Sequence, residues 1–314
     1  MARLLITGGL GYLGGRVADH LARHTAHTVR LSSRRAAAAW PEWAREFEVV
    51  TAGLDGDLGP VLDGMDAVVH LAALNAGACA ADPMAAIDVN VGGTLRLIAA
   101  AAKAGVSHVV YISTAHVYGA PLVGRLDETM PSRPRHPYAW THRAAEDIVL
   151  ASDGVAGTVL RLSNAVGAPM DGGADCWMLV ANDLCRMAAG GGPLVLRGDG
   201  SEARNFIPIA DAATAIDHAL SDPSRFAGGL YNLGGDATTT IGQLAERIAG
   251  LAATDGGQRP EIAYGTSAAM PNNGSLDFRV DKLRAAGFSP AGNMDAALVE
   301  TLHFCRQHFA DPAA

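Results

Sequence analysis

The sequence is poor in charge and in aromatic side chains. Charged residues make up 18% of its 314 residues and aromatic residues 5%, whereas hydrophobic residues make up 49%. So much apolar side chain excludes a disordered chain and predicts a globular protein with a large core. No apolar run approaches the roughly 18 residues that a membrane-spanning helix needs, so we expect no membrane partner.

Cysteine is scarce as well. The four cysteines lie far apart and form no C-x-x-C pair; they are Cys79, Cys176, Cys185 and Cys305. This spacing excludes a disulfide framework and a cysteine metal site, and it predicts free thiols in a reducing compartment. A predicted strand and turn begin within the first eight residues, where a signal peptide would lie. We therefore expect a cytoplasmic protein without a metal.

Positive charge is also in deficit. The chain has 24 lysines and arginines against 32 acidic residues, a formal net charge of −8. A negative balance argues against a nucleic-acid partner and against an anionic membrane surface.

Short apolar runs alternate with alanine-rich helical segments through the first half of the chain. This alternation predicts an α/β fold, a doubly wound parallel sheet of the Rossmann type. The predicted strands are 4–6, 28–32, 47–50, 66–71, 108–113 and 158–162, and the predicted helices are 12–24, 84–104 and 138–152.

The alternation breaks after Asn164, where glycine-rich loops begin. We therefore predict a dinucleotide-binding domain over 1–163 and a smaller substrate-binding lobe over 164–314. Segments of the second half, such as 230–233, are expected to return to the first domain.

The first strand leads directly into a glycine-rich turn that opens a helix. Gly8, Gly11 and Gly14 follow a G-x-x-G-x-x-G spacing, with Tyr12 and Leu13 at the start of the helix. Glycines let the backbone approach a phosphate, and free amides at a helix start favour negative charge. The turn therefore predicts a site for a dinucleotide pyrophosphate.

The second predicted strand ends without an acidic residue. The run there is Ser32-Ser33-Arg34-Arg35, whereas a carboxylate at this place would select NAD through the ribose hydroxyls. A small hydroxyl, Ser33, followed by two cations, Arg34 and Arg35, suits a 2′-phosphate, which favours NADP over NAD. A solvated basic loop is the alternative interpretation.

Polar side chains gather at the end of the fifth predicted strand and on the helix that follows. Ser113, Thr114 and His116 leave the strand, and ligands bind at this edge of a parallel sheet. Tyr138 and His142 are four residues apart and therefore share one helical face.

Several motifs occur in a fixed order along the chain: Thr7–Gly14 (T-G-G-x-G-[FY]-[IL]-G), His70–Ala73 (H-x-A-A), Asn90 in the following helix, Ser113–Gly119 (S-[ST]-x-x-V-Y-G), Arg161–Asn164 (R-x-x-N) and Arg204–Asp211 (R-D-[FY]-I-x-x-x-D, here with Asn205). With these motifs in this order, the chain resembles the nucleotide-sugar epimerase/dehydratase branch of the extended short-chain dehydrogenase/reductase superfamily.

The resemblance implies roles for these residues. Thr114 would hydrogen-bond the reacting oxygen, and Tyr138 would exchange the proton as hydride moves to or from the nicotinamide. Asn164 and Arg204 would hold the substrate's diphosphate. The implied cofactor contacts also include Leu71, Ala72, Ala73 and Asn90. A homodimer formed through helices 84–104 and 138–152 is implied too.

Three departures from the family's pattern bear on the chemistry. In the first, His142 stands where the family has the lysine of Y-x-x-x-K. That lysine grips the nicotinamide ribose and lowers the pKa of the tyrosine. A histidine is mostly neutral at pH 7, so it would still bind the ribose but would help Tyr138 less.

The second departure follows Thr114. Ala115 and His116 replace the acid pair of the family's 4,6-dehydratases, so dehydration is not expected. His116 is either an auxiliary acid/base and substrate contact or a structural histidine.

The third departure concerns the second phosphate. The family usually has an arginine several residues before its last aspartate motif, which we take as Asp281, but Asn272 and Asn273 stand there. Arg259 and Arg279 do not occupy the matching position.

We therefore predict an NAD(P)-dependent oxidoreductase or epimerase acting on a nucleotide sugar, as a 4-epimerase or a 4-keto reductase. Two alternatives stay open. One is a reductase of a non-nucleotide sugar or polyol carbonyl, and the other is a cofactor-binding protein whose active site has decayed at His142.

Overall fold

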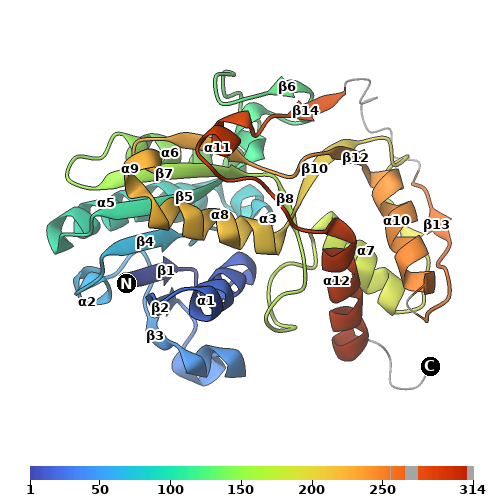
Figure 1. Ribbon diagram of the computed structural model, residues 1–314, viewed down its shortest axis with the longest axis horizontal. Helices are drawn as coiled ribbons and strands as arrows, with labels where there is room; N and C mark the ends of the chain where they lie inside the picture. The colour runs from blue at the N-terminus through green and yellow to red at the C-terminus, as the bar shows by residue number, and fades with distance from the viewer. Residues whose placement is uncertain (255, 266–274, 310–314) are drawn as a thin grey trace.

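The computed structural model describes residues 1–254, 256–265 and 275–309. Its main feature is a sheet of seven parallel strands in the order β11-β7-β5-β4-β1-β2-β3 (Figure 1). The strands are β1 (Arg3–Thr7), β2 (Thr28–Ser33), β3 (Glu48–Thr51), β4 (Ala67–His70), β5 (His108–Thr114), β7 (Ala156–Leu162) and β11 (Leu230–Leu233).

Helices cover both faces of this sheet, because alternate residues of each strand point to opposite sides. Leu4 and Ile6 of β1 pack in one apolar core with helix α1 (Tyr12–His24) and helix α8 (Ile209–Ser221). Leu5 of the same strand packs in the other core, with helix α5 (Gly93–Ala104) and helix α6 (Pro137–Leu150).

A long continuous helix crosses the second face. It comprises α4 (Pro83–Ala86), a π-helical turn η3 (Ile87–Gly92) and α5. An 18-residue window of Pro83–Ala104 has a mean hydropathy of 1.3, which by length and composition alone suffices for a membrane span. The sequence-based expectation that no segment reaches this length was therefore wrong. Leu97, Ile98 and Ala101 of this helix are buried in the core, whereas Met84 and Leu95 are exposed.

The second half of the chain forms another body beside the carboxyl ends of the strands. It contains helices α7 (Val180–Ala189), α10 (Ile241–Thr254) and α12 (Met294–Phe309), which enclose their own apolar core (Figure 1). A short mixed sheet links this body to the main one: β10 (Ala203–Pro208) pairs with β8 (Asn164–Val166) in parallel and with β12 (Thr238–Thr240) in antiparallel.

The predicted fold class is confirmed, and the strand at 230–233 does return to the main sheet beside β7. Helix α8 returns as well and packs on α1. The division at 163/164 coincides with the change from β7 to β8, and its assignment as a domain boundary stays a prediction.

Remaining short elements connect these parts: α2 (Gly59–Leu62), α3 (Ala76–Ala81), α9 (Pro223–Phe226), α11 (Asp281–Ala285), β6 (Gly124–Leu126), β9 (Leu194–Val195), β13 (Ile262–Ala263), β14 (Leu276–Phe278), and the 3₁₀ turns η1 (Ala37–Ala39), η2 (Glu42–Glu46) and η4 (Ala115–Tyr118).

Candidate active site

The glycine turn connects β1 to α1 at the carboxyl end of the sheet. Gly8 has a positive φ of 67°, and a Cβ there would lie 3.0 Å from the backbone nitrogen of Ala72. A Cβ on Gly14 would collide with the carbonyl oxygen of Gly8. The turn therefore requires glycine at both places, and it packs against the predicted loop 71–73.

The start of α1 fits a dinucleotide phosphate. Gly11 precedes the helix and no side chain caps it. Among the described residues, no protein acceptor bonds the backbone N–H groups of Tyr12, Leu13 and Gly14. Free N–H groups at the start of a helix of this length form an anion site, so the predicted cofactor-binding residues of the turn fit the pyrophosphate.

A chain of buried hydrogen bonds supports the turn from below. The backbone N–H groups of Leu71 and Ala72 donate to Thr7 Oγ1, each at 3.2 Å. Thr7 Oγ1 lies 2.7 Å from His70 Nδ1, and His70 Nε2 lies 3.0 Å from Thr94 Oγ1. Because the Thr94 hydroxyl donates to the carbonyl oxygen of Asn90 at 2.6 Å, each group in this chain has a partner.

Asn90 lies in the π-helical turn and is buried. Its Oδ1 accepts from the backbone N–H of Leu74 at 2.8 Å, and its Nδ2 donates to Thr141 Oγ1 at 3.0 Å. These bonds tie the loop after β4 to α6. The hydrogen bonds that the structure gives Asn90 all go to protein groups, so its predicted contact with the cofactor stays a prediction.

Ser33 and Arg34 follow β2 at the same edge of the sheet. Ser33 Oγ accepts a hydrogen bond from the backbone N–H of Arg35 at 3.2 Å. Arg34 is exposed and has no ion pair or hydrogen bond within the described ranges. Its guanidinium is therefore free to meet an anion.

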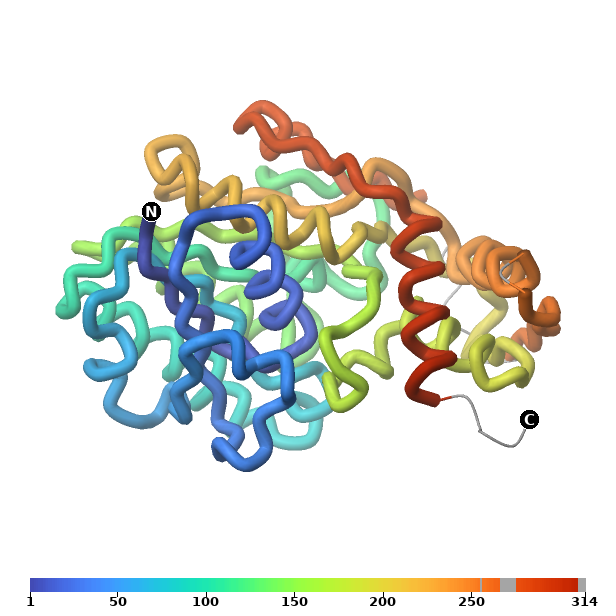
Figure 2. Tube along the Cα trace, turned by 60° about the horizontal axis from the view of Figure 1, so that its bottom comes forward, coloured from blue at the N-terminus to red at the C-terminus, as the bar shows by residue number. Residues whose placement is uncertain are grey.

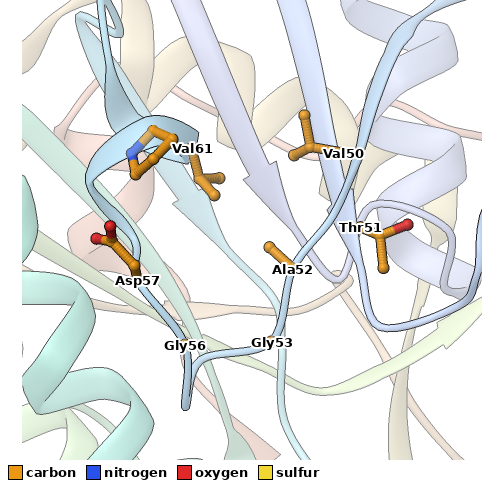
Figure 3. A pocket seen from close by; sticks show the side chains of 8 residues that line it. Val50, Thr51, Ala52, Gly53, Gly56, Asp57 and Val61 are labelled. Carbon is orange, nitrogen blue, oxygen red and sulfur yellow. The ribbon is translucent and has the colours of Figure 1, made fainter.

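A cavity of about 380 Å³ opens beside the end of β3 (Figure 3). It is lined by Val50, Thr51, Ala52, Gly53, Gly56, Asp57, Pro60 and Val61. A Cβ on Gly53 would lie 3.6 Å from Arg34 Cγ, so the cavity adjoins Arg34. None of the predicted catalytic residues lines it.

Thr114 and Tyr138 meet across the junction of β5 and α6. Thr114 ends β5, and Tyr138 lies in the first turn of α6. The Thr114 hydroxyl is close enough to hydrogen-bond Tyr138, which lowers the pKa of Tyr138, but burial outweighs it and raises the pKa to about 12. Tyr138 is therefore protonated at pH 7.

His142 lies one helical turn beyond Tyr138, and their rings meet edge to face with centroids 4.4 Å apart. Its Nδ1 is 2.6 Å from the hydroxyl of Tyr111, and its Nε2 is buried and has no partner among the described residues. Burial lowers the pKa of His142 to about 3, so the ring is neutral at pH 7. The structure thus brings the three predicted catalytic residues together without a cation among them.

His116 and Arg204 are the next predicted site residues. Burial and the nearby Arg204 charge lower the pKa of His116 to about 4. His116 Nδ1 and Arg204 Nε are both buried and have no partner within the described part of the chain, while Arg204 Nη2 pairs with Glu202 at 2.7 Å.

Asn164 reaches the same area because β8 pairs with β10, with Asn164 opposite Phe206. Its Nδ2 donates to the carbonyl oxygen of Asn205 at 2.8 Å. Ser163 Oγ, one residue earlier, is buried without a partner. Buried polar atoms usually have partners, so the three unpartnered atoms of His116, Ser163 and Arg204 indicate a place for a polar ligand.

A loop over residues 167–179 is hydrogen-bonded to residues that flank the glycine turn. Tyr12 Oη donates to the carbonyl oxygen of Gly167 at 2.8 Å, and Trp43 Nε1 donates to Asp171 Oδ2 at 3.0 Å. On the opposite side, Asn75 Nδ2 donates to Asp175 Oδ2 at 2.6 Å. Figure 2 shows this yellow-green segment running beside α1. The loop therefore connects both sides of the glycine turn.

Arg259 and Arg279 do not offer a free cation in place of the family's second-phosphate arginine. Arg259 pairs with Glu246 at 2.5 Å, and Arg279 pairs with Asp281 at 2.7 Å. Asn272 and Asn273 lie outside the described residues.

Reasoning from sequence missed Tyr111 and Glu146. Tyr111 and Ser113 share a face of β5, and they hydrogen-bond His142 and Glu146, which share a face of α6. The sequence did offer a signal for this contact. Two polar residues lie two apart on a buried strand, and two more lie four apart on the next helix.

The chain is similar to known proteins over most of its length. A sequence profile of the NAD dependent epimerase/dehydratase family matches residues 4–234. The UDP-glucose 4-epimerase 4 of Oryza sativa subsp. japonica is 31% identical over 307 residues, covering 84% of this chain and 83% of that protein. A dTDP-glucose 4,6-dehydratase of Streptomyces griseus is 30% identical over 257 residues, covering 79% of this chain and 74% of that protein.

A solved structure of similar architecture is the UDP-glucose 4-epimerase of Thermus thermophilus in complex with NAD. It superposes with a TM-score of 0.79 at 26% identity, covering 98% of this chain and 99% of that chain.

Proposed function

The chain belongs to the NAD dependent epimerase/dehydratase family, and from this premise we propose that it transfers hydride at C4 of a nucleotide sugar, as a 4-epimerase. The family predicted from the sequence motifs is thereby confirmed. The observation that carries the reaction is the cluster of Thr114, Tyr138 and His142 at the same edge of the sheet as the glycine turn. The relatives named UDP-glucose 4-epimerase support the choice of C4.

The bound nicotinamide would supply the hydride acceptor and donor. Gly8, Gly11, Gly14 and the start of α1 would hold its pyrophosphate, and His142 would face its ribose. Tyr138 would take the proton from the C4 hydroxyl when hydride leaves and return it when hydride comes back. Thr114 would hold the same oxygen by a hydrogen bond.

A 4-keto reductase is the second candidate, and the state of Tyr138 favours it. Reduction requires a protonated tyrosine that gives its proton to the forming alkoxide, and Tyr138 is protonated at pH 7. Oxidation requires the phenolate, which the neutral His142 does little to stabilise. The site as built is therefore better suited to the reducing half of the reaction.

A dehydratase is a weaker candidate, although a 4,6-dehydratase is among the relatives. Elimination of water from a sugar requires an acid and a base beside the catalytic threonine. Ala115 offers neither, and only His116 is left at that place.

The preference for NADP over NAD also remains a proposal. It is supported by the free guanidinium of Arg34 and by the absence of a carboxylate at the end of β2. The similar Thermus thermophilus epimerase was solved as a complex with NAD, so both cofactors have to be compared.

One experiment separates these candidates. The purified protein is denatured, and its released nucleotides are identified by mass spectrometry. Fresh protein is then incubated with UDP-hexoses and followed by ¹H NMR, and with a 4-keto nucleotide sugar plus NADPH or NADH. Retained cofactor with interconversion of C4 epimers supports the epimerase. Empty protein that oxidises added NADPH supports the reductase, and no turnover in either assay contradicts the proposal.

A further inference from the structure

The hydrogen bond between Tyr111 and His142 has a definite direction. The Tyr111 hydroxyl is buried and makes no other hydrogen bond in the part of the chain that the structure describes. If His142 Nδ1 were the donor, the Tyr111 proton would have no acceptor and Nε2 would be a bare acceptor without a donor. If Tyr111 donates, its proton has a partner, and only His142 Nε2 is left without one.

The charge states of the two rings agree with this direction. Burial raises the pKa of Tyr111 well above its usual value, so its hydroxyl keeps its proton. Burial lowers the pKa of His142 to about 3, so the imidazole carries a single proton. Because Nδ1 accepts from Tyr111, that single proton is on Nε2.

The remaining group is therefore an N–H donor at Nε2, which is buried and has no acceptor among the residues that the structure describes. His142 is 4% exposed, and Tyr138, which faces it at 4.4 Å between ring centroids, lies four residues earlier on α6. The titratable groups around it include His70 of β4, Tyr111 of β5, His116 of η4 and Tyr138 of α6, and none of these four is charged at pH 7. Glu146, one turn further along the same face of α6, is paired with Arg161.

We propose that Tyr111 is a positioning residue that holds His142 as the neutral Nε2–H tautomer, so that His142 donates an uncharged hydrogen bond to a hydroxyl of the nicotinamide ribose. This inference rests on the proposed dinucleotide binding. His142 then keeps the ribose contact of the lysine that it replaces but gives up the lysine's positive charge. Because the lysine's positive charge is missing, the pKa of Tyr138 stays high.

The tautomer is measured in the free protein by long-range ¹H–¹⁵N NMR with ¹⁵N-histidine. The variant His142→Gln identifies the signal by its loss. We expect a protonated Nε2, an unprotonated Nδ1 and no titration between about pH 5 and 9 in the wild-type protein. Tyr111→Phe removes the donor, so the two nitrogens should shift toward averaged values. Tyr231→Phe is the matched control, because it removes another buried tyrosine hydroxyl, bonded to Arg225 O at 3.1 Å, and should leave the His142 signal unchanged.

Dinucleotide affinity provides the second measurement, by fluorescence titration with NADPH and NADH. Tyr111→Phe should weaken binding by about tenfold, the effect of one well-placed hydrogen bond. In the His142→Gln background the same change should have almost no effect, because the glutamine amide donates without help from Tyr111.

Two results would overturn the inference. One is a wild-type His142 protonated at Nδ1, and the other is unchanged tautomer and affinity in Tyr111→Phe. Failure of the wild-type protein to bind either dinucleotide would instead refute the proposed function together with the ribose contact, while the NMR signal would still report whether Tyr111 sets the tautomer.

Discussion

Glu146 of α6 and Arg161 of β7 form a fully buried two-point ion pair. Glu146 Oε2 lies 2.7 Å from Arg161 Nη2, and Glu146 Oε1 lies 2.9 Å from Arg161 Nε. Ser113, next to Thr114 in the chain, donates to Oε1 at 2.6 Å. Since Tyr138 and Glu146 lie on the same helix, the ion pair joins the helix that carries Tyr138 to β7, and the Ser113 hydrogen bond joins it to β5, which carries Thr114.

The first prediction concerns this ion pair. Glu146→Gln leaves the Arg161 charge buried without a counter-charge, so we expect the free energy of unfolding to fall by about 3 kcal/mol. Denaturant unfolding followed by circular dichroism measures it. Asp147→Asn is the matched control on the neighbouring position, because the Asp147 side chain is 63% exposed, and it should change stability by less than about 0.5 kcal/mol. Equal losses in both variants would contradict the role of the buried pair.

The second prediction concerns the proton carried by Tyr138. Its pKa is raised to about 12, so the reducing direction, which needs the protonated form, should show a kcat/KM nearly independent of pH between about 6 and 10. The oxidising direction needs the phenolate, so its kcat/KM should rise about tenfold per pH unit there. His116 and His142 stay neutral over this range, because their pKa values are lowered to about 4 and about 3.

Tyr138→Phe provides the control for this profile. It should lower turnover by about 10² to 10⁴-fold and leave dinucleotide affinity unchanged. Full activity in this variant, or a break in the wild-type profile near pH 7, would rule out Tyr138 as the proton carrier.

The third prediction concerns the replaced lysine. In His142→Lys an ammonium group beside Tyr138 favours the phenolate, so the pH profile of the oxidising direction should move down by about one unit or more. The same charge is buried, and the carboxylate on this face of the helix, Glu146, is already paired with Arg161, so the free energy of unfolding should fall. Thermal unfolding and pH–rate profiles test both effects, and an unshifted profile in a folded variant would show that position 142 does not act on Tyr138.

The fourth prediction concerns cofactor choice. Arg34→Ala removes the free cation at the end of β2, so NADPH affinity should fall by about tenfold while NADH affinity stays the same. Arg35→Ala is the matched control, because Arg35 Nη2 already contacts Gly173 O at 3.5 Å, and it should not change the ratio of the two affinities. Parallel fluorescence titrations measure the ratio, and equal losses for both dinucleotides would contradict a 2′-phosphate site.

The fifth prediction concerns the proposed homodimer. Met84 and Leu95 on the outer face of the Pro83–Ala104 helix are 66% and 57% exposed, so this face presents large apolar side chains at the surface. A second copy would cover this face together with α6. Leu95→Asp should therefore shift the protein from dimer to monomer in sedimentation velocity. Val195→Asp, at a position 52% exposed on β9, should not, and a monomeric wild-type protein would remove the proposal.

The sequence by itself determined the features that depend on neighbouring residues. The glycine turn at 8–14, the alternation of strands and helices, and the shared helical face of Tyr138 and His142 follow from backbone freedom and from the periods of strand and helix. The family motifs added Thr114 and Arg204 as candidate site residues. The third strand was placed one residue early, at 47–50 instead of 48–51, because apolar runs do not mark where a strand ladder ends.

Only the tertiary structure decided which partner each buried polar atom meets. His142 is bound by Tyr111, 31 residues earlier, and Asn90 joins Leu74 to Thr141. The direction of a hydrogen bond and the pKa of a buried ring depend on such distant partners and on burial. The sequence therefore predicted a mostly neutral histidine in place of the lysine, and the fold decided that this ring is buried and that Tyr111 is the partner of its Nδ1.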